Sequence, residues 1–128
     1  MKIKPAKTQF RFSLGDRGEV IAAAYLVEKG YKILKKKART AYGELDVIAQ
    51  IKDTLVFIEV KTRSSKQFGL PEEAVEIQKQ KQMTRLANAY IQKNVLSKMK
   101  MRFDVIALLY DGVNEPQIRH IQDAFNAE

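Results

Sequence analysis

The order of hydrophobic periodicities along the chain is the feature that most constrains its fold. Residues 44–51 alternate between two faces, residues 55–62 are rich in β-forming side chains, and Lys52-Asp53 closes the connection between them, which predicts a β-hairpin. A segment with helical periodicity follows; it begins between residues 71 and 77 and ends near Val95. The strongly apolar segment 101–110 predicts another strand. A hairpin followed by a helical crossover indicates a mixed sheet covered by helices.

Shorter segments complete the predicted order of elements. An alanine-rich helix is expected to begin at Ser13 or Asp16 and to run to about Lys29, with Gly30 as the glycine that follows a helix end. Because this helix is largely apolar, we expect it to be buried on most sides. The remaining elements are a strand at 31–39, a short edge strand at 117–121 and an apolar plug at Ala124-Phe125. The order is therefore α-β-β-β-α-β-β, in one α/β domain at residues 13–128 that follows a basic arm at residues 1–12.

The chain of 128 residues contains no cysteine and a single histidine, His120. The sequence therefore excludes disulfide bonds, thiolate zinc sites, iron–sulfur clusters and cysteine nucleophiles, and it excludes a zinc site built from several histidines of one chain. Any metal ion would need mainly oxygen ligands, which suit magnesium, calcium or manganese. We expect His120 to have a surface or structural role rather than a catalytic one.

Positive charge is concentrated in the first third of the chain. The formal net charge is +8; residues 1–41 contain eleven basic and three acidic side chains, and the remainder sums to zero. This distribution favours an anionic partner, with nucleic acid first and an acidic membrane surface second, although a solvated basic face has the same composition. The longest apolar stretch covers only residues 20–27, and no targeting segment is visible. We therefore expect a cytoplasmic protein without a membrane partner.

Charged residues at the end of the strand 55–62 carry the candidate chemistry. Glu59 and Lys61 are two residues apart, so their side chains share one face of the strand. Burying such a pair is costly unless other groups satisfy it. Asp46 belongs to the preceding strand, and pairing of the two strands could bring its carboxylate close to that of Glu59.

A divalent cation would resolve the repulsion between two such carboxylates. Mg²⁺ prefers oxygen ligands, and Mn²⁺ is an alternative. Glu19, directly before the apolar stretch of the first helix, is a candidate for an additional ligand, and Glu44 is a weaker one. The alternation of residues 44–51 also predicts that Leu45 and Val47 face the same way, opposite to Asp46.

Five blocks of the sequence resemble a known family when they are taken in order. Asp46 followed by Glu59-Val60-Lys61 resembles the PD-(D/E)XK nuclease signature. More narrowly, the chain resembles the YraN family, a bacterial family of predicted nucleases that is similar in layout to archaeal Holliday-junction resolvases. The blocks that carry this resemblance are Gly18-Glu19, residues 43–49, residues 57–63, Lys79-Gln80 and residues 102–105. The sequence departs from the family pattern at Lys36-Lys37, where the family usually has Arg-Asn, and at Glu76, where it has Thr or Ser.

The resemblance implies a restriction-endonuclease-like fold with a divalent-metal site. Asp46 and Glu59 would be the metal ligands, Glu19 the auxiliary acid on a helix, and Lys61 the catalytic lysine. Junction-cutting relatives with this layout act as dimers, which makes a homodimer a reasonable expectation. The candidates for phosphate contact are Arg63 and Lys79 from the resemblance, together with Arg17, Lys36, Lys37 and Arg39 from the basic first third.

The function expected from these observations is that of a magnesium-dependent DNA endonuclease that hydrolyses phosphodiester bonds, for example in branched or damaged DNA. Two alternatives remain open at this level. The first is a nucleic-acid-binding module of the same fold with little or no turnover, acting in a DNA-processing complex. The second is a basic structural protein on RNA or on an acidic membrane.

Overall fold

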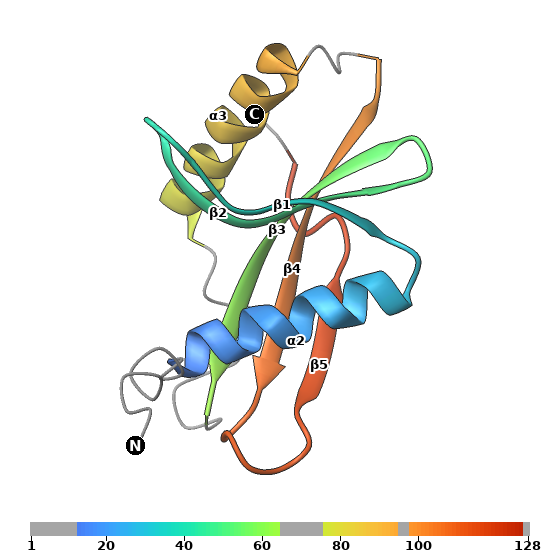
Figure 1. Ribbon diagram of the computed structural model, residues 1–128. Helices are drawn as coiled ribbons and strands as arrows, with labels where there is room; N and C mark the ends of the chain where they lie inside the picture. The colour runs from blue at the N-terminus through green and yellow to red at the C-terminus, as the bar shows by residue number, and fades with distance from the viewer. Residues whose placement is uncertain (1–12, 65–75, 95–97, 127–128) are drawn as a thin grey trace, which may run out of the picture.

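The computed structural model describes residues 13–64, 76–94 and 98–126. The expected basic arm at residues 1–12 and most of the expected loop after the third strand lie outside these residues. Within these residues the chain forms two helices and five strands, which are labelled in Figure 1. In chain order they are α2 (Leu14–Glu28), β1 (Lys32–Thr40), β2 (Gly43–Ile51), β3 (Thr54–Arg63), α3 (Ile77–Lys93), β4 (Lys100–Leu109) and β5 (Gln117–Ile121).

The five strands form one mixed sheet in the order β1-β2-β3-β4-β5. The pairs β1–β2, β2–β3 and β4–β5 are antiparallel, whereas β3 and β4 are parallel and are joined through α3. The predicted mixed α/β architecture is therefore confirmed, as is the edge position of β5. None of the described helices is long and apolar enough to cross a membrane.

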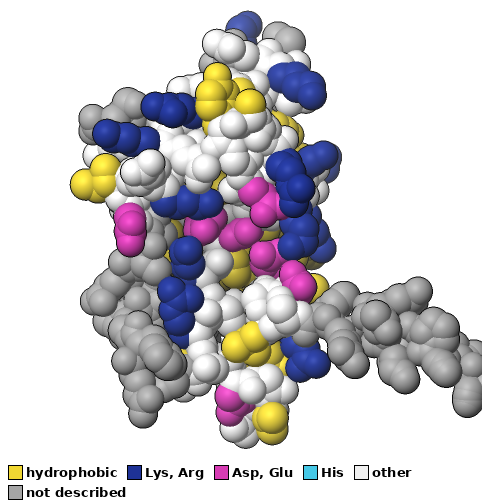
Figure 2. All heavy atoms as spheres, turned by 90° about the vertical axis from the view of Figure 1, so that its left-hand side faces the viewer, with side chains coloured by type: hydrophobic (Ala, Val, Ile, Leu, Met, Phe, Trp, Pro, Cys, Tyr) yellow, Lys and Arg dark blue, Asp and Glu magenta, His cyan; other side chains and the backbone are white. Residues whose placement is uncertain are grey.

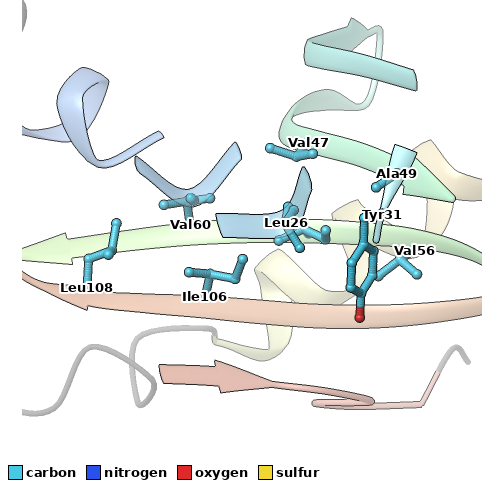
Figure 3. Packing of buried hydrophobic residues seen from close by; sticks show 10 residues of the cluster. Leu26, Tyr31, Val47, Ala49, Val56, Val60, Ile106 and Leu108 are labelled. Atoms are coloured by element: carbon cyan, nitrogen blue, oxygen red, sulfur yellow. The ribbon is translucent and has the colours of Figure 1, made fainter. Parts of the chain in front are cut away.

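Each helix covers one face of the sheet, and β3 lies in the centre between them (Figure 1). Because both of its faces are covered, the six residues from Leu55 to Val60 are all buried. The cluster on the α2 side contains Ala22, Leu26, Tyr31, Val47, Ala49, Val56, Ile58, Val60, Ile106 and Leu108; Figure 3 shows most of its side chains. The cluster on the α3 side contains Ala38, Leu45, Ile48, Leu55, Phe57, Met83, Leu86, Ala87 and Phe103.

Helix α2 begins with a capping box that matches the predicted start. Asp16 N donates a hydrogen bond to Ser13 Oγ at 3.0 Å, and the Asp16 carboxylate accepts one from Ser13 N. Gly30 follows the helix with φ 96°, as expected for a glycine after a helix end. The expectation that this helix is buried on most sides is wrong, because Val20 and Val27 are more than half exposed.

Gly18 allows α2 to approach β3 closely. A Cβ atom at this position would overlap with Oγ1 of Thr62 and would press on the Leu108 side chain. The buried Thr62 Oγ1 has no hydrogen-bond partner among the described residues, so the contact is one of close packing. This approach places the next residue of the helix, Glu19, over the sheet.

The C-terminal segment packs on the face of the sheet that α3 covers. Phe125 stacks on Phe103 with ring centroids 4.8 Å apart, which confirms the predicted apolar plug for Phe125, whereas Ala124 is exposed. Helix α3 packs Met83, Leu86 and Ala87 into the same cluster.

Candidate functional site

Both β1 and β2 break their regular alternation beside Asp46. Ala38 pairs with Leu45, and at the next position Lys37 lies opposite Asp46. Leu45 packs on the α3 side, whereas Val47 packs on the α2 side, so β2 changes face across Asp46. The prediction that Leu45 and Val47 face the same way is therefore wrong. Lys37 has φ 51°, a left-handed backbone conformation that a lysine rarely adopts.

This irregularity places the Asp46 carboxylate between β2 and β3. The register of the two strands runs from Ile51–Thr54 to Val47–Ile58. Beyond it, Asp46 Oδ2 accepts a hydrogen bond from Val60 N at 2.7 Å. A side chain thus contacts the β3 backbone where a regular ladder would use a carbonyl group.

Asp46 interacts electrostatically with an acid on each of two neighbouring elements. Burial, followed by the nearby carboxylate of Glu59, raises the pKa of Asp46 from 3.8 to about 6. Burial also raises the pKa of Glu19 on α2, and the charge of Asp46 adds to this rise. The structure therefore brings together the three acids that were predicted as ligands, with Asp46 in the middle.

Glu59 is the most deeply buried of the three acids, with 6% of its surface exposed. Its Oε2 lies 3.4 Å from Nζ of Lys61, and its Oε1 lies 3.6 Å from Nζ of Lys79 on α3. Oε1 has no hydrogen-bond partner among the described residues, although burial of a polar atom normally requires one. Lys79 also donates a hydrogen bond to the carbonyl oxygen of Glu44 at 3.1 Å, which ties α3 to β2.

On the α2 side, Glu19 has a cationic partner of its own. Lys37 Nζ lies 2.8 Å from Glu19 Oε1 and 3.4 Å from Asp16 Oδ1. A cavity of about 240 Å³ adjoins this cluster; Asp16, Glu19, Val20, Lys36, Lys37, Asp46 and Val47 line it.

Within residues 13–64, 76–94 and 98–126, no group of three acidic or histidine side chains is arranged to hold a metal ion as it stands. Three ammonium groups accompany the acids instead. Lys37 contacts Glu19, and both Lys61 and Lys79 contact Glu59. The acids therefore form a partly neutralised cluster around Asp46.

The three arginines that were predicted to contact phosphate, Arg17, Arg39 and Arg63, are not among the lysines that contact Glu19 and Glu59. Arg39 pairs with Glu44 at 2.9 Å near the end of the β1–β2 hairpin, which assigns the weak ligand candidate Glu44 to an exposed ion pair. Arg63 donates to the carbonyl oxygen of Thr62 at the end of β3. Arg17 is exposed on α2. Figure 2 shows acidic side chains in the middle of one face, with Lys and Arg side chains on both sides of them.

A buried polar network centred on Asp104 was not predicted from the sequence. Arg102 donates two hydrogen bonds to this carboxylate at 2.9 Å, and Nε2 of His120 lies 2.7 Å from it. The hydroxyl groups of Tyr25 and Tyr31 extend the network to His120 and Arg102 respectively. The available signal was an aspartate, Asp104, within a mostly apolar segment. The network confirms a structural role for His120.

The chain is similar to bacterial proteins over almost its whole length. It is 46% identical to a UPF0102 protein of Trichlorobacter lovleyi over 115 residues, which cover 89% of this chain and 91% of the relative. It is 45% identical to a UPF0102 protein of Syntrophotalea carbinolica, covering 94% and 98% of the two chains. It is 47% identical to one of Thermodesulfovibrio yellowstonii, covering 90% and 97%. The sequence profile described as "Uncharacterised protein family UPF0102" matches residues 18–108, and the chain belongs to this family.

Proposed function

We propose that the protein is a divalent-metal-dependent nuclease that hydrolyses phosphodiester bonds in DNA, on a restriction-endonuclease-like fold. The single observation that carries the proposal is the burial of Asp46 beside the carboxylate of Glu59, which together raise the pKa of Asp46 to about 6, with Lys61 next to Glu59. The resemblance to the PD-(D/E)XK signature and to the YraN family supports the same reading, because the residues in these positions are the ones it assigns to catalysis.

The donor atoms of this cluster fit a hard cation such as Mg²⁺ or Mn²⁺. Oε1 of Glu59 is buried without a hydrogen-bond partner among the described residues, and Asp46 is crowded by a second carboxylate. A cation between carboxylates removes both penalties, and oxygen ligands suit magnesium. Asp46 and Glu59 would hold the ion, with Glu19 as the additional acid from α2. A bound ion would supply Lewis-acid activation of water and stabilise the charge that develops on the phosphate.

The residues of the chain itself have separate tasks in this proposal. Val60 N–H orients the Asp46 carboxylate, and Gly18 lets α2 bring Glu19 close to it. Lys61, whose ammonium group lies 3.4 Å from Glu59, is positioned to orient the attacking water and to stabilise the pentacoordinate phosphate. The Lys and Arg side chains on both sides of the acids would hold the DNA backbone (Figure 2).

The test is a cleavage assay on branched, nicked, single-stranded and duplex DNA, with and without Mg²⁺. We expect cleavage that requires Mg²⁺ or Mn²⁺ and that disappears in Lys61→Ala and in Asp46→Asn. Lys52→Ala and Asp53→Asn remove the same charges from the exposed turn between β2 and β3 and serve as matched controls that retain activity. Cleavage that survives both site substitutions, or no cleavage of any substrate, would contradict the proposal.

One observation favours a second function, that of a DNA-binding module without turnover. Lys37 contacts Glu19, and Lys61 and Lys79 contact Glu59, so these two acids have cationic partners without a metal ion. Titration calorimetry with Mn²⁺ separates the two functions, because a pure binding module needs no metal. Binding assays on DNA, RNA and anionic vesicles at several salt concentrations test for the remaining anionic partners.

A further inference from the structure

Lys37 occupies a cationic position beside the acids of the candidate site. Its Nζ lies 2.8 Å from Glu19 Oε1 and 3.4 Å from Asp16 Oδ1, and it helps to line the cavity of about 240 Å³ that Asp46 also lines. At this distance the ammonium group forms an ion pair with a proposed metal-site acid.

The backbone directs this side chain toward the acids. Lys37 has φ 51° and lies opposite Asp46 in the β1–β2 register, where both strands change face. A lysine in this left-handed conformation is strained relative to ordinary strand geometry. The strain is located at the residue whose ammonium group reaches Glu19.

We propose that Lys37 is an internal counter-ion that occupies the cation position beside Glu19 until a divalent ion binds, and that it then moves to a phosphate of the DNA. This inference rests on the proposed function, because it concerns the same metal site. It assigns Lys37 two alternating partners, the acids of the cluster and the DNA backbone.

Lys37 and a divalent cation would compete for the Glu19 carboxylate because both are positively charged. A divalent cation ligated by Glu19 and an ammonium group 2.8 Å from the same carboxylate repel each other strongly at such distances. The Lys37 side chain can leave because it is 55% exposed and ends on a flexible four-carbon stem. Once displaced, the ammonium group lies at the edge of the acidic cluster, where a phosphodiester bound to the metal ion would lie. A phosphate is then its natural partner.

The same exchange couples the two binding events. A metal ion that displaces Lys37 makes its charge available to DNA, so metal binding raises DNA affinity. By linkage, DNA that holds Lys37 raises metal affinity by the same factor. The protein would thus load its metal ion most readily when its substrate is present.

The first experiment measures Mn²⁺ affinity of the free protein by electron paramagnetic resonance. We expect Lys37→Ala to bind Mn²⁺ about tenfold more tightly than the wild type, because a unit charge next to the ligands is removed. Lys37→Gly provides a second variant, since glycine adopts a positive φ without strain and secures folding. Lys36→Ala removes the same charge from the wall of the same cavity and should change the affinity less than twofold.

The second experiment measures the affinity for a nicked DNA duplex with and without Ca²⁺, with the probe checked for intactness. We expect Ca²⁺ to raise the affinity of the wild type and of Lys36→Ala, and to raise that of Lys37→Ala at least threefold less. Equal tightening of Mn²⁺ binding by Lys36→Ala and Lys37→Ala would overturn the inference, as would unchanged Mn²⁺ affinity in Lys37→Ala. A protein without the proposed metal site gives a different result. Neither wild type nor Lys37→Ala would then bind Mn²⁺ more tightly than Asp46→Asn does, and this result would contradict both the proposed function and the inference.

Discussion

The carboxylate of Asp46 accepts a hydrogen bond from Val60 N at 2.7 Å, so a side chain of β2 contacts the backbone of β3 beyond the paired part of the two strands. This contact holds Asp46 next to Glu59 despite the repulsion between the two carboxylates. The arrangement costs stability in the metal-free protein and provides ligands when a cation is present.

Asp46→Asn should therefore stabilise the metal-free protein. The asparagine oxygen can still accept from Val60 N, while the charge next to Glu59 is removed. The pKa of Asp46 rises from 3.8 to about 6, which corresponds to about 1–3 kcal/mol in the free energy of unfolding. Urea denaturation in the presence of EDTA measures the difference, and Asp53→Asn is the matched control.

The pH dependence of this difference has a definite sign. Because the folded state binds the Asp46 proton more tightly than the unfolded state does, the wild type is penalised above pH 6 and is relieved as the pH falls toward 4. The stability gap between Asp46→Asn and wild type should be largest near pH 7.5 and should nearly vanish near pH 4. A gap that is constant between these pH values would contradict the assigned cause.

Asp104→Asn should strongly destabilise the protein. Asp104 is fully buried and accepts hydrogen bonds from Arg102 and Asp123 N, and it is also hydrogen-bonded to His120. Burial alone would raise its pKa, but these bonds outweigh burial and hold the pKa below the ordinary value. Removing the charge leaves Arg102 without its anionic partner, which costs about 3 kcal/mol in such pairs. Thermal and urea denaturation at pH 7 measure the loss.

The same carboxylate should contribute to acid unfolding. Since the pKa of Asp104 is depressed in the folded state, its contribution is fully present above the ordinary value of 3.8 and is lost as the pH falls below it. The exposed acid Glu115, changed to Gln, is the matched control and should unfold like the wild type. Equal stability of Asp104→Asn and this control would refute a stabilising role for the network.

Gly18→Ala should destabilise the protein and disturb the candidate site together. The added methyl group would overlap with Thr62 Oγ1, so α2 must shift away from β3 and carry Glu19 with it. Overpacking of this kind costs about 1–3 kcal/mol. Thr62→Ala removes an oxygen that has no hydrogen-bond partner among the described residues, and it should partly rescue Gly18→Ala. Strictly additive losses in this double-mutant cycle would show that the two residues do not interact.

Much of the fold follows from local patterns in the sequence. Ser13 and Asp16 form the capping box that their spacing indicates, and the alternation of β3 correctly separates Val56 and Ile58 from Leu55 and Phe57. These features depend on residues that are close in sequence, and propensity and periodicity describe such residues well.

The features that shape the candidate site depend on contacts that local patterns do not encode. Nothing in the sequence Lys36-Lys37-Ala38 indicates a positive φ at Lys37, and strict alternation gave the wrong face for Leu45. The ion pair of Lys37 with Glu19 requires the docking of α2 on the sheet. The Asp104–His120 contact likewise requires the β4–β5 register, which joins residues that are 16 apart in the chain.

Lys61 and Lys36 should affect DNA processing in different ways if the protein is the nuclease proposed here. Lys61 lies beside Glu59 in the cluster, so Lys61→Met should lower the cleavage rate by a factor of about 10²–10³ and leave DNA affinity within about threefold of the wild type. Lys36 is exposed at the rim of the cavity. Lys36→Ala should weaken DNA binding and reduce the slope of log affinity against log salt by about one, with a smaller effect on the rate at saturating DNA.

Single-turnover cleavage and binding titrations at several salt concentrations measure these quantities separately. Lys52→Ala, on the exposed turn between β2 and β3, controls for the loss of one positive charge. A Lys61→Met variant that loses affinity and rate in equal measure would place Lys61 among the phosphate-binding side chains instead of at the reacting phosphate. The separate roles proposed for Lys61 in catalysis and Lys36 in DNA binding require that rate and affinity respond to different lysines. An ammonium group that acts in the transition state contributes little to binding of the ground state.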